Sequence, residues 1–577
     1  MLIIARRGTR KLLNLRQVAA TSRALGFDVT ISDARGNLKG FATMVNSCDV
    51  LLAVHGAGLT NQIFLPVQAV VIQIVPWGKM DWMATNFYGE PARGMNLRYL
   101  EYHISEQESS LAQRYPRDHM VFKDPMAIHV DKMSFSVRRR SPPALVVPSG
   151  PTPTGELIPL TSMDKARLFS SFTSLHVFAG GATSIHDPAE TIRRAISAAL
   201  VHYYPVAGRI VTLGPSAGDD DDHDFRLACT GDGVLFAAAT ASCTLRDARF
   251  FLNAPPHADL ALRYGTCSVS DPLLLVQVTE FACGGYAVAA TWNHGVADGF
   301  GMAQLLRAVG ELARGLSPSV KPVRHDESIP DVPQHLLAAV LRRRTHAEVF
   351  KPVEYAYCDI TIPRSFIDRV KAEWRCAHAG DVRPCTEFEA VTAAIWRCRT
   401  RAIGAGADDE APAPLVFAAN IRRHVGAKEG YYGNCLTAQL VTAASGSVAS
   451  GGGAVVDLVR LIRDAKERIQ AEVVAGGEGS GSRRETVALG EELVTALCGY
   501  NALYVSSWGG LGMDGVDFGD GPPVRVLPSK ERVGAPACYP CLPRRRKDDD
   551  DDASIAVATC VTEEHVDEFM LQLSRLR

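Results

Sequence analysis

The chain has 577 residues, of which 47% are hydrophobic and 21% charged, as in ordinary globular proteins. Its net charge of −2 indicates no basic surface, so we expect no nucleic-acid partner. No apolar run reaches the roughly 18 residues of a membrane span, and the N-terminus is too charged for a secretory signal. The 14 cysteines are scattered along the chain, which is consistent with reduced thiols, so we expect a cytoplasmic protein. We also expect no membrane partner.

The first 130 residues alternate between helical and strand patterns. Helical spacing covers Leu13–Phe27 and Phe41–Cys48. Strand patterns cover Asp28–Asp33, the start of Asp49–Leu65, and Ala69–Pro76. Alternation of this kind predicts a Rossmann-like α/β fragment with a parallel sheet and with ligand chemistry at the strand ends.

A glycine-rich turn carrying His55, Gly56 and Gly58 follows the strand that begins at Asp49. The glycines allow close backbone approach, and a helix N-terminus at this point could hold the phosphate of a nucleotide sugar. A turn of this composition also occurs as plain punctuation between a strand and a helix. Both interpretations stay open at this stage.

Three segments of this region, Ala5–Asn14, Val54–Asn61 and Pro76–Ala92, together resemble the C-terminal part of plant glycosyltransferase family 61. The resemblance covers about residues 1–130 and implies a nucleotide-sugar donor. A complete member of that family has a membrane anchor and a further catalytic region upstream. We therefore expect residues 1–130 to be a half-domain without activity, with glycosyl transfer through this region as an alternative.

A boundary follows the first 130 residues. The segment His129–Leu160 is rich in Pro, Ser, Gly and Thr, which predicts a linker over residues 131–150. Met133 begins a stretch that could start a protein of its own. Residues 133–577 are long enough for two sizeable hydrophobic cores.

The most informative motif is TWNHGVADGFG, Thr291–Gly301. A strand-like run before it leads to His294, and Asp298 follows four residues later with glycines beside both. A helical pattern comes next. An imidazole at the end of a buried strand can take a proton from an alcohol or amine near neutral pH.

Seven segments, with this motif among them, occur in the order seen in the BAHD acyltransferases. They are Pro151–Asp164, His202–Ile210, Asn293–Gly299, Thr386–Arg397, Glu429–Cys435, Tyr504–Gly512 and Val516–Gly521. The resemblance implies an α/β fold of two chloramphenicol-acetyltransferase-like domains joined by a crossover. We expect the domains at residues 151–335 and 366–577, with the crossover at 336–365.

The resemblance also implies roles for the motif residues. His294 is expected to be the general base, and Asp298, beside Gly299, is expected to pair with an arginine, for which Arg422 is the candidate. Ser506 is expected to donate a hydrogen bond to the oxyanion. Because no Ser or Cys sits in a nucleophile elbow, we expect direct transfer in a ternary complex.

Further positions concern the pocket and a second family motif. Asn293 and Trp508 are candidates for the wall of the acyl or acceptor pocket, although Trp508 could equally be a buried aromatic residue of the core. The second motif consists of Asp517, Phe518, Gly519 and Gly521 and is expected to be structural, on the coenzyme A side. Its usual Trp is replaced by Asp520, and loss of a buried ring there would remove roughly 1.5–3 kcal/mol of apolar stabilisation.

We therefore expect an enzyme that transfers an acyl group, of hydroxycinnamoyl or benzoyl type, from coenzyme A to a hydroxyl or amine acceptor. The expected partners are these small molecules alone: acyl-CoA is a co-substrate, no cofactor is held permanently, and no metal is expected. The protein is expected to be a monomer. A non-catalytic fusion product is the remaining alternative.

Overall fold

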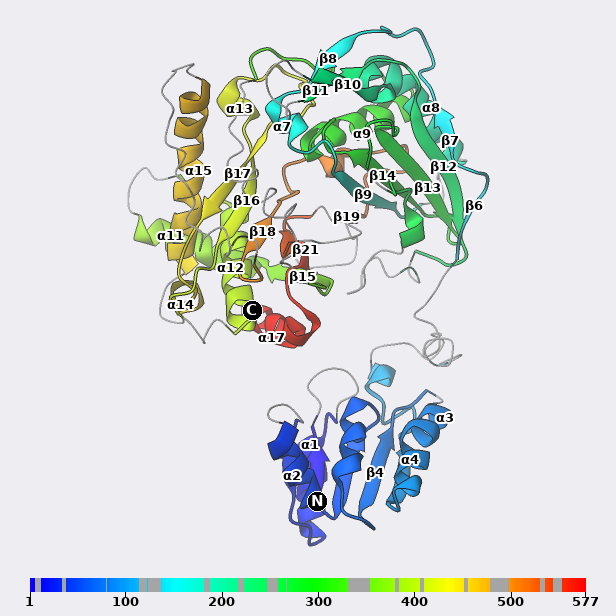
Figure 1. Ribbon diagram of the computed structural model, residues 1–577, viewed down its shortest axis with the longest axis vertical. Coiled ribbons are helices and arrows are strands. Elements are labelled where there is room, and N and C mark those ends of the chain that lie inside the picture. Colours follow the sequence, from blue (N-terminus) through cyan, green and yellow to red (C-terminus); the bar gives the residue numbers. More distant parts are fainter. Residues whose placement is uncertain are drawn as a thin grey trace. The chain divides into compact units, whose positions relative to one another are not determined.

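The computed structural model describes residues 1–5, 12–33, 38–78, 80–113, 122, 136–180, 187–215, 223–245, 248, 258–265, 267–329, 353–378, 383–404, 409–450, 455–477, 497, 499–529, 535–542 and 553–576. The chain forms two compact units, Met1–Ser134 and Phe135–Arg577. Each unit is described by itself (Figure 1).

The first unit is a five-stranded parallel sheet of order β2-β1-β3-β4-β5. Its strands are β1 (Leu2–Ile4), β2 (Thr30–Ser32), β3 (Val50–Val54), β4 (Val70–Val75) and β5 (Arg98–His103). Its helical segments are α1 (Leu15–Ala24), α2 (Leu38–Asn46), η1 (Ala57–Phe64), α3 (Asp81–Ala84), η2 (Thr85–Gly89), α4 (Glu90–Gly94) and η3 (Ser110–Gln113). The Rossmann-like prediction is confirmed, and β3 is apolar and buried throughout, as a central parallel strand must be.

The second unit begins with a seven-stranded sheet of order β19-β9-β14-β13-β12-β6, in which β7 also pairs with β12. These strands are β6 (Val137–Arg139), β7 (Ala144–Val146), β9 (Ser171–Phe178), β12 (Val234–Ala241), β13 (Leu274–Phe281), β14 (Tyr286–Asn293) and β19 (Arg525–Pro528). Helices α8 (Pro188–His202) and α9 (Gly299–Ala313) pack against each other beside this sheet (Figure 1).

A small antiparallel sheet, β10-β11-β8, lies in the same half of the unit. Its strands are β8 (Leu157–Pro159), β10 (Arg209–Pro215) and β11 (His223–Ala228). Short helical segments complete this half: α7 (Ser162–Lys165), η4 (Tyr204–Ala207) and η5 (Ala258–Leu260).

The other half contains a six-stranded sheet of order β15-β21-β20-β18-β16-β17. Its strands are β15 (Cys358–Pro363), β16 (Leu415–Asn420), β17 (Leu436–Val441), β18 (Leu503–Val505), β20 (Ala537–Tyr539) and β21 (Ala553–Thr559). Its helical segments are α11 (Arg364–Ala377), α12 (Glu387–Ala402), α13 (Arg422–Val425), α14 (Ser445–Ala449), α15 (Val455–Gly477), η6 (Met513–Gly515) and α17 (Glu563–Ser574). Helix α12 is buried on nearly every side, between α17, α15, α14 and α11.

The structure corrects the expected boundaries in three places. The linker predicted at 131–150 contains β6 and β7, which pair with β12, so residues 136–150 belong to the folded second unit. The predicted crossover, 336–365, contains β15, while its residues 336–352 lie outside the described part. Strand β19 comes from the C-terminal half but pairs with β9 of the first sheet, so the two halves are interlocked.

Among the described residues, no helix has the length and apolar character needed to cross a membrane.

Each unit should unfold on its own, because each forms hydrophobic clusters from its own residues. A fragment of residues 133–577 should keep the melting temperature that the second unit has in the full chain. Differential scanning calorimetry of both proteins checks this. A fragment that melts earlier than the corresponding transition of the full chain would show that the units stabilise each other.

Candidate active site

A cavity of about 1160 Å³ lies between the two halves of the second unit. Both sheets contribute to its wall, through the β14–α9 turn on one side and β16, α13, α15 and the segment after β18 on the other. His294, Asp298, Gly299, Arg422, Ser506 and Trp508 all line it. Sites for a single drug-sized ligand are roughly 300–1,000 Å³, so this cavity has room for two reacting groups.

The turn after β14 is fixed by its own side chains. The Trp292 indole Nε1 donates to the Ala297 carbonyl at 2.9 Å, and the Asn293 Oδ1 accepts from the Gly295 amide at 2.9 Å. A Cβ at Gly295 would lie 2.9 Å from the Leu168 Cα, so only glycine fits there. Asn293 is buried within this turn and does not line the cavity, which corrects its prediction as a pocket residue.

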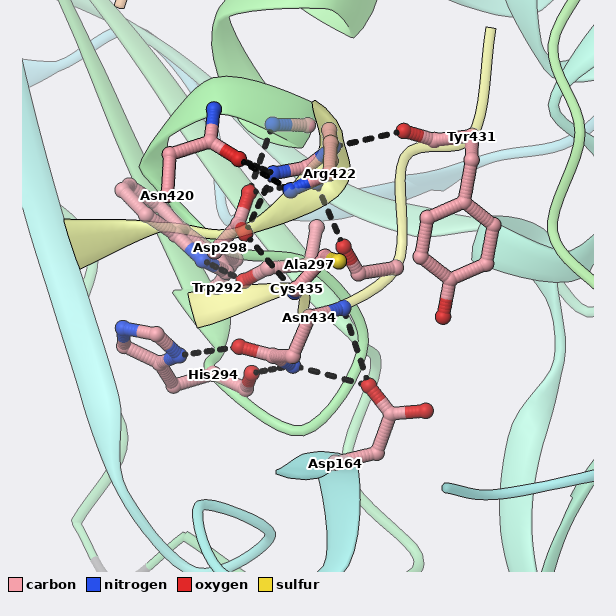
Figure 2. Close-up of polar contacts among 12 residues, drawn as sticks. Asp164, Trp292, His294, Ala297, Asp298, Asn420, Arg422, Tyr431, Asn434 and Cys435 are labelled. Atoms are coloured by element: carbon pink, nitrogen blue, oxygen red, sulfur yellow. Dashed lines mark hydrogen bonds and ion pairs between the residues drawn. The ribbon is translucent and has the colours of Figure 1, made fainter. Parts of the chain in front are cut away.

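Asp298 and Arg422 form a buried bidentate ion pair (Figure 2). The Arg422 Nη1 and Nη2 donate to the two carboxylate oxygens of Asp298, each at 2.9 Å. The carboxylate also accepts from the backbone amides of Gly301 and Cys435. The contact with Arg422 that was expected from the sequence is therefore present. The hydrogen bond from the Gly301 amide makes Asp298 the N-cap of α9.

These partners keep Asp298 ionised. Burial alone would raise the pKa of Asp298, but the charge and hydrogen bonds of Arg422 and the two backbone amides outweigh burial and lower it. The structure gives no hydrogen bond between Asp298 and His294 in the described part of the chain.

His294 is instead held by Asn434, which follows β16 and α13 (Figure 2). The Asn434 Nδ2 donates to the His294 carbonyl at 2.7 Å and to the Asp164 carboxylate at 2.9 Å. Asp164 is fully buried and is itself paired with Arg324, whose Nη2 lies 2.9 Å from its Oδ2. A second carboxylate, remote in sequence, thus anchors the residue that orients the imidazole.

This network decides which nitrogen of His294 carries the proton. Both groups that face the Asn434 Nδ2 are acceptors only, so the amide orientation is fixed and its Oδ1 faces the His294 Nδ1, 3.1 Å away. The Nδ1 must then donate, which leaves the lone pair on Nε2. Burial and the positive charge of Arg167 lower the pKa of His294 to about 4, so the imidazole is neutral at neutral pH.

Aromatic rings surround His294. The ring of Phe172 lies 5.5 Å from Trp292, 5.6 Å from Trp508 and 6.0 Å from Tyr539 between centroids, and 6.4 Å from His294. Phe172, Trp292 and Trp508 line the cavity. The sequence-based candidate Trp508 is therefore one member of an aromatic wall.

Ser506 lies at the end of β18 and faces the same cavity. Its backbone amide donates to the Cys538 carbonyl, which holds the segment in place. Its hydroxyl makes no hydrogen bond with any other described residue, so it is available to a ligand.

The second family motif forms a tight loop against α9. The Asp517 carboxylate accepts from the amides of Gly519 and Gly521 at 2.8 and 2.9 Å, and both glycines have positive φ. A Cβ at Gly310 would lie 2.5 Å from the Asp517 carbonyl oxygen, so helix and loop are in direct contact. The ring of Phe518 is buried beside Phe178.

Asp520, in place of the usual Trp, has its own neighbour. Burial, and next the nearby charge of Asp520, raise the pKa of the Tyr286 hydroxyl. Tyr286 is fully buried and stacks on Phe178 at 4.9 Å. Asp520 thus lies near the phenol of a tyrosine in the core.

The three candidates of the first unit occupy the turn after β3. His55 is buried, and its Nδ1 lies 2.7 Å from the Gln73 Nε2. Gly56 has φ 141°, and a Cβ at Gly58 would lie 3.1 Å from the Ile4 Cγ2. The segment that follows is a 3-10 helix, which differs from the expected helix start.

Several residues of the site had no predicted role, among them Asp164, Arg167, Phe172, Trp292, Arg324 and Asn434. Asp164 and Asn434 lie in segments that carried the family resemblance, so a signal was present for them. Their function depends on contacts between residues 140 or more positions apart, which a single sequence does not show.

Comparison with known proteins agrees with these two units. The model of the Transferase family matches residues 139–575, and that of Glycosyltransferase 61 matches residues 1–72. Acyl transferase 15 of Oryza sativa subsp. japonica is 38% identical over 460 residues, covering 76% of this chain and 98% of that protein. A beta-1,2-xylosyltransferase of the same species, XAX1, is 69% identical over 129 residues, which are 22% of this chain and 23% of that protein.

Solved structures show the same fold. Vinorine synthase has a TM-score of 0.54 at 19% identity, over 76% of this chain and 98% of its own. Fusarium graminearum TRI101, solved with ethyl coenzyme A, has a TM-score of 0.56 at 15% identity, over 72% and 96%. The two-domain chloramphenicol-acetyltransferase-like prediction is confirmed, and the chain belongs to the BAHD acyltransferase family, with an N-terminal unit similar to part of a family 61 glycosyltransferase.

Proposed function

We propose that the second unit transfers an acyl group from coenzyme A to a hydroxyl or amine acceptor, with His294 as the general base. One observation carries the proposal: His294 lines a cavity shared by both halves of the unit, and the contact of its Nδ1 with Asn434 leaves its Nε2 to accept a proton. Because the pKa of His294 is lowered to about 4, its imidazole is mostly in the neutral form, which can accept a proton, at neutral pH.

The reaction follows from this placement. The acceptor gives its proton to the His294 Nε2 as its oxygen or nitrogen attacks the thioester carbonyl carbon. Collapse of the tetrahedral intermediate breaks the carbon–sulfur bond, and the imidazolium returns the proton to the departing sulfur. No atom of the protein forms a bond to the acyl group, so both substrates must be bound together, and the cavity volume permits this.

Ser506 is proposed to stabilise the oxyanion. Its hydroxyl faces the cavity without another partner in the described chain, as a preorganised donor must. Coenzyme A is the proposed co-substrate, and a neighbour of the same fold, TRI101, has been solved with it.

The acyl group is proposed to be aromatic. The wall formed by Phe172, Trp292 and Trp508 offers ring faces and edges at separations suited to aromatic packing. Two caffeoyltransferases of Crocosmia x crocosmiiflora, 32% and 31% identical over most of their length, act on aromatic acyl groups by name. The choice between oxygen and nitrogen acceptors, a cytoplasmic location and a monomeric state remain predictions.

Glycosyl transfer by the first unit remains an alternative prediction. It draws on the 69% identity to XAX1, of which this chain spans 23%.

Loss of the base should abolish most turnover. In a screen of acyl-CoA donors against alcohols and amines, read by thiol release, the active pair should lose about 10²–10⁴ in kcat on His294→Ala substitution. Binding of acyl-CoA and the melting temperature should stay near those of the parent protein. Ser506→Ala should also lose rate without losing stability. A His294→Ala enzyme with near-normal kcat would rule out the general-base role.

Asp298→Ala should behave differently, because it leaves Arg422 buried without its partner. Breaking a buried pair in this way costs about 3–5 kcal/mol, so the free energy of unfolding should fall together with activity. The double variant Asp298→Ala/Arg422→Ala should lose less stability than the two single variants added together. Unchanged stability with a crippled rate would instead place the Asp298 carboxylate in proton transfer.

A further inference from the structure

Three arginines and two carboxylates of the described residues lie around the His294 turn. Each carboxylate pairs with one arginine, so the third arginine has no carboxylate partner among them. Arg324 pairs with Asp164 at 2.9 Å, and Arg422 pairs with Asp298 at 2.9 Å. Both carboxylates have their oxygens committed to these arginines and to amide donors. Among the described residues, Arg167 has no ion pair.

Arg167 sits on the segment that packs against the base. The next turn of this segment supplies the Ser170 carbonyl, which accepts from the His294 backbone amide at 2.8 Å. The Arg167 Nη1 donates to the Met163 carbonyl at 3.0 Å, and this is its one hydrogen bond to a described residue through the guanidinium. The side chain lines the cavity, so its remaining N–H donors are accessible to a ligand there.

The charge of Arg167 affects the pKa of His294. Burial lowers the pKa of Arg167, while the charges of Asp298 and Asp164 raise it without contact. The pKa of His294 is lowered mainly by burial, and the second cause is the positive charge of Arg167. A partly desolvated cation that lacks a counter-ion is a cost to the empty protein, and a bound anion would remove it.

We propose that Arg167 binds a free carboxylate on a substrate, and that the enzyme thereby selects acidic substrates. The inference rests on the proposed acyl transfer, since it concerns the same cavity. A guanidinium presents parallel N–H donors that match a carboxylate, and such charge-assisted pairs are strong and specific.

The phosphates of coenzyme A do not account for Arg167. The thioester must lie beside the His294 Nε2 to react, and the pantetheine arm separates it from the phosphates. The carboxylate is therefore carried either by the acceptor or by the acyl chain. Both sources place the same group beside the same guanidinium.

The test compares acids with their neutral counterparts in two arms. The acceptor arm uses malate and 4-hydroxyphenylacetate, each beside its methyl ester, with acetyl-CoA or benzoyl-CoA as donor. The acyl arm compares malonyl-CoA with acetyl-CoA, with benzyl alcohol as acceptor. The proteins are the full chain and its Arg167→Gln and Arg167→Lys variants, with Arg193→Gln, an exposed arginine of α8, as the matched control.

In one arm, the parent enzyme should prefer the acid. Arg167→Gln should lower kcat/KM for that acid by about tenfold or more, the value of a hydrogen-bonded charge contact. Values for the neutral counterpart should change less than those for the acid, because loss of the Arg167 charge acts on neutral substrates only through the pKa of His294. Arg167→Lys should retain part of the preference for the acid, and Arg193→Gln all of it. Equal losses on acids and neutral substrates, or no preference for the acid in either arm, would overturn the proposal.

A binding measurement separates this proposal from the proposed function. The melting temperature of each protein is recorded with and without 4-hydroxyphenylacetate, its methyl ester and malonyl-CoA. If no pair of substrates turns over, but an acid stabilises the parent protein and not Arg167→Gln, acyl transfer fails and the carboxylate site stands. If turnover occurs with no acid preference and no Arg167-dependent stabilisation, the carboxylate site fails and acyl transfer stands.

Discussion

The buried pair of Asp298 and Arg422 is the interaction on which the site depends. It joins the first turn of α9, next to the seven-stranded sheet, to α13, which follows a strand of the six-stranded sheet. Two charges buried together are costly unless every oxygen and N–H finds a partner. Here the carboxylate accepts four hydrogen bonds, and Arg422 also donates to the carbonyls of Tyr431 and Gly433. The ion pair thereby fixes the two walls of the cavity relative to each other.

His294, the proposed base, is fixed by different groups. Asn434 orients the imidazole of His294 and is itself fixed by Asp164, whose charge is balanced by Arg324. Two carboxylates thus have separate tasks: Asp298 fastens the turn, and Asp164 anchors the amide that sets the tautomer. A histidine and an aspartate four residues apart suggest a dyad in a helix, but the turn at Gly295 directs the two side chains to different partners.

The sequence was sufficient for features that depend on local pattern. Long apolar runs predicted β14 and β3, and the glycine-flanked motif placed His294 and Asp298 at a strand end. The short edge strand β6 was not predicted. It has only three residues, two of them arginines, and it lies in a segment whose composition is typical of a linker. Strand β19 escaped because its partner, β9, is more than 300 positions away.

Site residues followed the same division. Trp508 and Ser506 were found through motif position, and both line the cavity. Asn293 was predicted to line the pocket, whereas its side-chain oxygen accepts a hydrogen bond within the turn. Arg167 carried no signal, since only the tertiary pairing of Asp164 and Asp298 shows that it has no carboxylate of its own.

The protonation of His294 tests the account most directly. Nitrogen-15 chemical shifts of its imidazole, assigned by comparison with His294→Ala, report both charge and tautomer across a pH titration. The account predicts a neutral ring with the proton on Nδ1 at neutral pH, and protonation only as the pH falls to about 4, below which base function is lost. A ring that titrates near 6.5, or that carries its neutral-state proton on Nε2, would contradict it.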